Sequence, residues 1–172
     1  MNRLRTGAAR ATNSVSLLIS ILVRYPEVAS VTYNPEATLL KFTFLLARSI
    51  SGRRFRRVDH QLRKSLDAYG RLEGHPAPGV QLSATTHGGV SVLEMRHDAH
   101  SLSREMLSLM IEVVRAELGD LLAIEPNPSL LEEDLAVQEE VIEEMLEDLR
   151  ESGQDRNLIA FREEGRVLVF NR

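Results

Sequence analysis

Apolar and polar residues alternate in three stretches of the chain, and this alternation predicts β-strands. The first stretch is residues 38–46. Residues 80–86 alternate in the same way and are joined by a Gly-Gly turn to a returning strand over 90–97. A strand over 28–33 and a closing hairpin over 158–170 complete the predicted strands. In the first stretch the residues expected to face the core are Leu40, Phe42, Phe44 and Leu46.

Apolar residues at helical spacing predict four helices, over residues 14–24, 56–72, 102–118 and 132–151. The first is apolar nearly all round, so we expect it to be buried. Ser101 is the expected N-cap of the third helix. The fourth follows a Pro-Asn-Pro linker and opens with a Ser-Leu-Leu-Glu capping box.

The order of these elements predicts an α+β fold. From residue 38 to residue 125 the order is strand, helix, strand, strand, helix and a short strand over 121–124, which is that of the ferredoxin-like, split βαβ fold. An extra helix and strand precede this core, and a helix plus β-hairpin follow it. The Pro-rich linker divides the chain into a core domain over 1–126 and an appendage over 127–172.

The composition excludes several kinds of chemistry. The 172 residues contain no Cys, which excludes disulfides, thiolate catalysis and Cys-ligated metals. Glycine-rich phosphate-binding motifs and the Gly-x-Ser-x-Gly elbow of esterases are also absent. We therefore expect no cofactor. The apolar run near the N-terminus is too short to span a bilayer and lacks a cleavage site, so a cytoplasmic location without membrane attachment is expected.

Charge is sorted along the chain. The formal net charge is −4, but residues 1–71 carry 13 Lys and Arg against 4 Asp and Glu, whereas residues 72–172 carry 8 against 21. The basic extreme is a run whose cations we expect to contact an anion, either a nucleic-acid phosphate or the chain's own acidic helix. Alternatively, the run is a solvated surface. Its candidate anion-binding residues are Arg53, Arg54, Arg56 and Arg57.

One cluster has the residue types of a metal site. Glu94, His97 and His100 lie at the end of a predicted strand and just before a helix, and imidazole and carboxylate groups are common metal ligands. The alternative is a polar loop whose histidines have no shared role. The two interpretations differ in whether the connecting turn brings the three side chains together.

The C-terminal segment predicts association. Its acidic helix is amphipathic, and its hairpin is apolar on both faces. Because a two-stranded hairpin is barely stable alone, it must dock on the main domain, extend its sheet or pair with another subunit. The expected interface residues are Leu131, Leu135, Ile142, Met145, Leu149, Phe161 and Phe170.

These observations favour a non-enzymatic module that acts through protein–protein association, either as a homo-oligomer or with a partner protein, and that has an Arg-rich anion-contacting surface. One alternative is an RNA-binding protein. Because no aromatic platform for base stacking is predicted, such a protein would contact the phosphate backbone. A further alternative is a metal-dependent enzyme that uses Glu94, His97 and His100.

Overall fold

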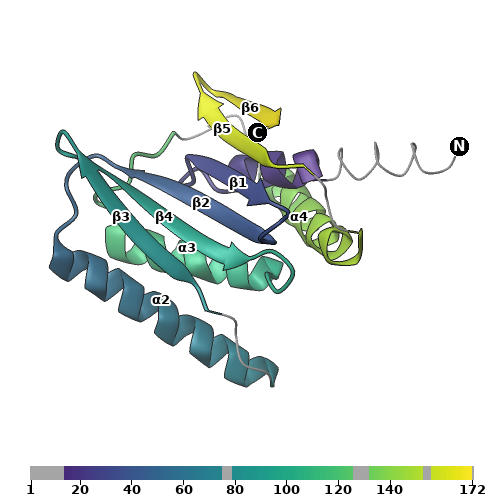
Figure 1. The fold of residues 1–172 in the computed structure, drawn as a ribbon, viewed down its shortest axis with the longest axis horizontal. Coiled ribbons are helices and arrows are strands. Elements are labelled where there is room, and N and C mark those ends of the chain that lie inside the picture. Colours follow the sequence, from purple (N-terminus) through teal and green to yellow (C-terminus); the bar gives the residue numbers. More distant parts are fainter. Residues whose placement is uncertain (1–13, 75–78, 126–131, 153–155, 172) are drawn as a thin grey trace, which may run out of the picture.

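The computed structural model describes residues 14–74, 79–125, 132–152 and 156–171 (Figure 1). This part of the chain is α+β, with four helices and a six-stranded antiparallel sheet. The first helix spans residues 14–24. The other elements are β1 (Ser30–Asn34), β2 (Leu39–Leu46), α2 (Gly52–Glu73), β3 (Gln81–His87), β4 (Val90–Asp98), α3 (Arg104–Leu118), α4 (Glu132–Ser152), β5 (Leu158–Glu163) and β6 (Arg166–Asn171).

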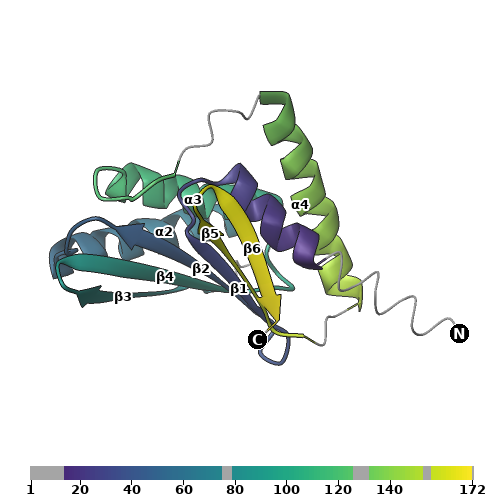
Figure 2. The ribbon, with the colours of Figure 1, turned by 90° about the horizontal axis from the view of Figure 1, so that it is seen from above.

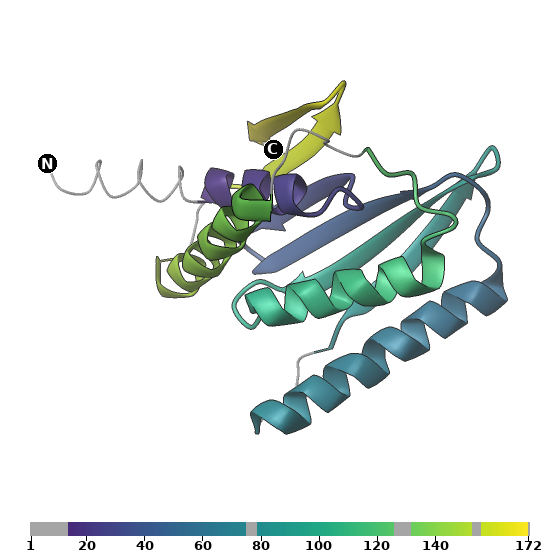
Figure 3. The same cartoon turned by 180° about the vertical axis from the view of Figure 1, so that it is seen from behind.

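The helices lie on one face of the sheet, whose strand order is β3-β4-β2-β1-β5-β6 (Figures 2 and 3). No described helix covers the opposite face, which we call the open face. The burial of β2 follows this arrangement, because its apolar alternate residues are fully buried and Lys41, Thr43 and Leu45 between them are half-buried or exposed. The predicted core face of this strand is therefore confirmed.

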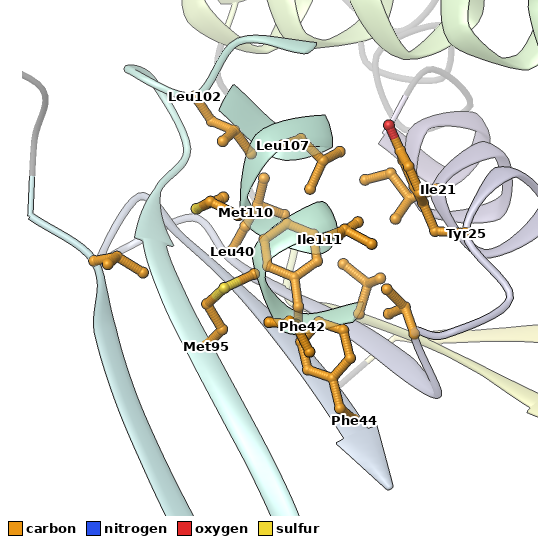
Figure 4. Close-up of a cluster of buried hydrophobic side chains, with 14 of the residues drawn as sticks. Ile21, Tyr25, Leu40, Phe42, Phe44, Met95, Leu102, Leu107, Met110 and Ile111 are labelled. Carbon is orange, nitrogen blue, oxygen red and sulfur yellow. The ribbon is translucent and has the colours of Figure 1, made fainter. Parts of the chain in front are cut away.

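The core lies between the sheet and the helices (Figure 4). Phe42 of β2 and Met95 of β4 face Met110 and Ile111 of α3. Tyr25, just after the first helix, closes one side of this cluster. Burying a side chain as large as that of Phe42 stabilises the fold by roughly 2–3 kcal/mol.

The predicted strand over 121–124 is reduced to one β-bridge, between Leu46 and Leu122. Two backbone hydrogen bonds flank it, from Ala47 N to the Leu121 oxygen and from Ala123 N to the Leu45 oxygen, each 2.8 Å long. The strand is short because β1 already pairs with this edge of β2, from Leu39 to Thr43. Only the end of β2 is left for the segment that follows α3.

The C-terminal hairpin is part of the same sheet. β5 pairs with β1 from Ser30 opposite Phe161 to Tyr33 opposite Leu158. The segment predicted as a separate appendage thus supplies two of the six strands and extends the sheet edge, one of the three expected outcomes for the hairpin. It also contributes to the single core cluster, with Ile142, Leu146, Leu149, Leu158 and Ala160.

The N-cap of α3 is Ser103, so the prediction of Ser101 is wrong. The Ser103 hydroxyl accepts from Met106 N at 3.1 Å. Ser101 is instead held by Asp98, whose carboxylate accepts from the Ser101 amide at 3.0 Å and from its hydroxyl at 2.7 Å. Because Ser101 belongs to this turn at the end of β4, the helix begins after Ser103 instead.

Arg162 of β5 joins the hairpin to the first helix. Its Nη2 donates to the carbonyl oxygens of Leu22, Tyr25 and Val28, and its Nε also donates to Val28. The carbonyls at the C-terminal end of a helix lack partners within the helix and carry partial negative charge, so a cation is favourable there. Burial lowers the pKa of Arg162, but these acceptors compensate for part of its lost hydration.

We predict that Arg162→Ala lowers the free energy of unfolding by about 3 kcal/mol, because several charge-assisted hydrogen bonds are lost and buried carbonyls are left without donors. Urea denaturation followed by circular dichroism measures this change. Arg166→Ala, an exposed position on the same hairpin, is the matched control and should cost less than about 0.5 kcal/mol. Equal losses in the two variants would contradict this role for Arg162.

Candidate functional site

The Arg run lies in the first two turns of α2. Ser51 caps this helix, and its hydroxyl accepts from Arg54 N at 3.2 Å. No acidic residue is present in the first turn. The Arg side chains therefore lie near the positive end of the helix dipole, which repels them. A bound anion would offset this repulsion.

Two cations of the run have partners on α3 and just beyond it. Arg54 donates to both carboxylate oxygens of Asp120, at 2.6 and 3.0 Å, and to the Glu117 carbonyl at 2.7 Å. Arg57 lies 3.0 Å from the Glu117 carboxylate. The hydrogen bond from Arg54 lowers the pKa of Asp120 below its ordinary value. These acids neutralise part of the run.

The acidic helix does not meet the Arg run within the chain. Its Glu139 lies 2.9 Å from Arg24 and 3.5 Å from Arg104, and its Glu143 lies 4.0 Å from Arg104. The views of the molecule agree that α2 and α4 are far apart (Figures 2 and 3). The acidic helix is therefore not the internal counterpart of the Arg run in one chain.

The solvent side of α2 remains basic. Arg53 and Arg56 are exposed, and no ion pair joins them to any other residue that the structure describes. Further basic residues follow at helical spacing along the same side. We call this surface the α2 basic face: Arg53, Arg56, Arg57, His60, Arg63 and Lys64.

The structure does not bring Glu94, His97 and His100 together. Residues 94 and 97 lie on opposite faces of β4, since side chains alternate along a strand. Glu94 is on the open face, 2.5 Å from Arg96 and 3.5 Å from Lys41. No group of three His, Cys, Asp or Glu residues within the described ranges is placed to hold a metal ion.

His97 is a core residue, with 1% of its surface exposed. Its Nδ1 lies 2.8 Å from the carbonyl oxygen of Asp98. Because a carbonyl only accepts, the proton is assigned to Nδ1, and Nε2 is left buried without a partner among the described residues. Burial lowers the pKa of His97, so the neutral ring is the stable form in the fold.

The predicted interface residues have several different environments. Leu131 lies outside the described residues. Ile142 and Leu149 of α4 are buried within the chain, Leu135 and Met145 are half-buried, and the inward-facing Leu146 was missed. The last two predicted interface residues, Phe161 and Phe170, lie on the open face of the hairpin.

The phenylalanine pair forms an apolar surface at one side of the sheet. The rings of Phe161 and Phe170 are stacked with their centroids 5.6 Å apart, and Phe170 is 51% exposed. Leu168 lies directly opposite Phe161 in the β5–β6 register. Leu168 is not one of the expected interface residues, although the alternation of the hairpin places it on the same face as Phe170.

β6 is an edge of the sheet, and its backbone orientation follows from the β5 pairings. Arg162 N donates to the Ala29 oxygen, so every second backbone group of β5 from Arg162 points toward β1. The groups of Phe161 and its alternate neighbours point toward β6 and bond its residues 166, 168 and 170. The amides of Val167, Val169 and Asn171 therefore point outward, away from the sheet.

A cleft of about 430 Å³ opens at the end of the sheet where β1 begins and β5 ends. It is lined by residues of β1 and of the segment after α3, which share one edge of β2. Nothing in the sequence motifs predicted it. The only local sign was a single charged residue, Arg162, on the otherwise apolar inward side of a strand. The lining residues are Pro26, Ala29, Ser30, Thr43, Leu45, Ala123, Ile124, Glu125, Phe161 and Arg162.

Comparison with known proteins gives no relative: no family model, curated protein or solved structure matches the chain. No helix in the described ranges is both long enough and apolar enough to cross a membrane. The geometry described above leaves three candidate surfaces: the edge and open face of the hairpin, the cleft, and the α2 basic face.

We predict that the stability of the fold falls on acidification because of His97. The pKa of this ring is lower in the folded chain than in the unfolded chain, so the unfolded state binds the proton first as the pH falls below about 6.5. Replacing the ring by Leu should reduce the loss of unfolding free energy between pH 7 and pH 5 by about 1–2 kcal/mol.

Urea denaturation at both pH values measures this difference. The exposed His100→Asn variant controls for the number of histidines. An identical loss between pH 7 and pH 5 in wild type and His97→Leu would contradict the assignment of a neutral buried ring.

Proposed function

We propose that this protein is a non-enzymatic, cytoplasmic α+β module that self-associates through β6, the outer strand of its C-terminal hairpin. The observation that carries this proposal is the outward row of β6 amides beside apolar side chains on both strand faces. Sheet edges usually carry charges, proline or bulges that discourage pairing. Between Val167 and Phe170, β6 has none of these.

A second copy fits this edge because the strand is complementary to itself. In antiparallel pairing about Val169, that residue stands opposite the partner's Val169, and Val167 stands opposite the partner's Asn171. The outward amides then form about six interchain hydrogen bonds, against about four for pairing about Leu168. A two-fold axis relates two such strands, as in most homodimers.

The side chains support the same pairing. On the open face Leu168 stands opposite the partner's Phe170, and such apolar cross-strand pairs contribute about 0.2–1 kcal/mol each. Phe161 extends this surface through its stack on Phe170. The only charged residue of β6, Arg166, lies at the start of the strand, outside the central pairs.

The strand pairings also support the ferredoxin-like assignment for residues 39–123. β4 lies between β2 and β3, which α2 connects, and this is the split βαβ arrangement. The Leu46–Leu122 bridge stands where the last strand of that fold would pair with its first. In this interpretation β1 has displaced most of the last strand.

We predict a dimer in solution that changing both Leu168 and Phe170 to Lys abolishes, because each new ammonium would stand opposite another in the partner. Light scattering of the full chain over a range of concentrations measures the mass. Leu72→Lys, which changes a leucine that is 87% exposed on α2, is the matched control and should leave the dimer intact. A wild-type monomer at all concentrations contradicts self-association.

The pairing register has its own test, because the chain has no cysteine. Val169→Cys should give a disulfide-linked dimer on mild oxidation, since its Cα lies about 5.5 Å from that of the partner's Val169. Val167→Cys should not, since the equivalent residues are about 13 Å apart along the strands. Preferential linkage through Leu168→Cys would instead assign the neighbouring register.

A second candidate function is electrostatic contact with a nucleic-acid backbone. It is supported by the exposure of the α2 basic face and by the distance of the acidic helix from it. Phosphate contacts of this kind need no base-stacking platform and weaken steeply with salt. The surface would contact phosphates through Arg53 and Arg56, which hold no structural ion pair with a described residue.

We predict that Arg53→Ser combined with Arg56→Ser lowers the salt concentration at which the protein elutes from heparin, since two phosphate-type contacts are lost. The fold should be unchanged. Arg156→Ser combined with Arg166→Ser removes two exposed cations outside α2 and is the matched control. Equal effects of the two double variants, or no retention of wild type at low salt, would exclude this second function.

A further inference from the structure

The cleft at the end of the sheet is lined by apolar side chains and by one cation, Arg162. Leu45 and Ile124 are each 40% exposed, and with Phe161 they form an apolar lining. Ser30 and Thr43 add hydroxyl groups to the lining. A volume of about 430 Å³ falls within the range of about 300–1,000 Å³ that small-molecule sites occupy.

Arg162 has donors to spare. Its Nε and Nη2 make all the hydrogen bonds that join it to described residues, and every one of these acceptors is a backbone carbonyl. The two hydrogens on Nη1 therefore have no partner in the described part of the chain. A guanidinium that is partly buried without a carboxylate in contact favours an anion.

No neighbouring acid among the described residues forms a hydrogen bond with Arg162, so the guanidinium can bind an external anion. Glu27 is buried and its charge attracts Arg162, but its hydrogen bonds come from Arg115, including one of 2.7 Å from Nε. Glu125 is exposed at the rim of the cleft and attracts Arg162 without a hydrogen bond between them. Because two carboxylates already lie near this one cation, a singly charged anion suits the cleft better than a doubly charged phosphate.

We propose that this cleft binds a carboxylate carried by a small apolar group. The carboxylate accepts from Nη1 of Arg162, and the apolar group lies between Leu45, Ile124 and Phe161. Two sources have this chemistry: a free aliphatic acid, and the C-terminus of a peptide that ends in an apolar residue. The cleft shares Phe161 with the apolar surface of the hairpin but includes no residue of β6, so carboxylate binding does not require self-association.

The test is a titration of the full chain, followed by amide chemical shifts, with hexanoate and with the tripeptide Gly-Gly-Leu. Hexanamide and the amidated tripeptide are the matched neutral probes. We expect saturable shifts around residues 29–30, 43–45, 123–125 and 161–162, with at least about tenfold weaker binding of the neutral probes. The tighter of the two acids identifies the source. Equal binding of acid and amide, or no binding of either acid, overturns the proposal.

Two variants test the site without disturbing Arg162, whose loss also destabilises the fold. Ile124→Asp places a carboxylate in the exposed wall and should abolish hexanoate binding, while Leu72→Asp, at an exposed leucine on α2, should not. Glu125→Gln removes the rim charge and should strengthen binding by about twofold to fivefold. Unchanged hexanoate binding in both Ile124→Asp and Glu125→Gln overturns the assignment to this cleft.

Discussion

The pairing of β5 with β1 is the interaction on which the rest of the structure depends. It places β1 in the interior of the sheet, between β5 and β2. On the β2 side, β1 occupies most of the strand edge, so only the end of β2 is left for the segment after α3. It also brings Arg162 to the carbonyls of Leu22, Tyr25 and Val28, so that the last strand pair stabilises the end of the first helix. The two ends of the described chain thus fold as one unit.

The same pairing contributes to both proposed sites, since it also brings Phe161 and Arg162 of β5 to the cleft. Because β5 extends the sheet, β6 becomes its edge and presents its outward amides. β1 and the segment after α3 share one edge of β2, and residues of both line the cleft. The charge asymmetry of the sequence has a separate explanation, since the Arg run is partly neutralised by Asp120 and Glu117 and the acidic helix by Arg24 and Arg104.

Local patterns predicted the elements, and competition between distant segments decided their arrangement. The alternation of β2 was enough to predict its core face, and the same alternation, applied to β4, already separates Glu94 from His97. By contrast, nothing local shows that β1 rather than residues 121–124 pairs with most of β2, because both are short strands that compete for one edge. The cleft results from that competition, so local sequence patterns could not predict it. The one local indication was Arg162, a charged residue on the inward side of β5.

The central claim, that β6 is both fixed in the sheet and open to a second copy, is tested most directly by hydrogen exchange of its individual amides at low and high protein concentration. Arg166, Leu168 and Phe170 should exchange slowly at both concentrations, because their amides bond β5. Val167, Val169 and Asn171 should exchange quickly when dilute and slowly when concentrated. Fast exchange of these three at every concentration in a folded hairpin would contradict the account.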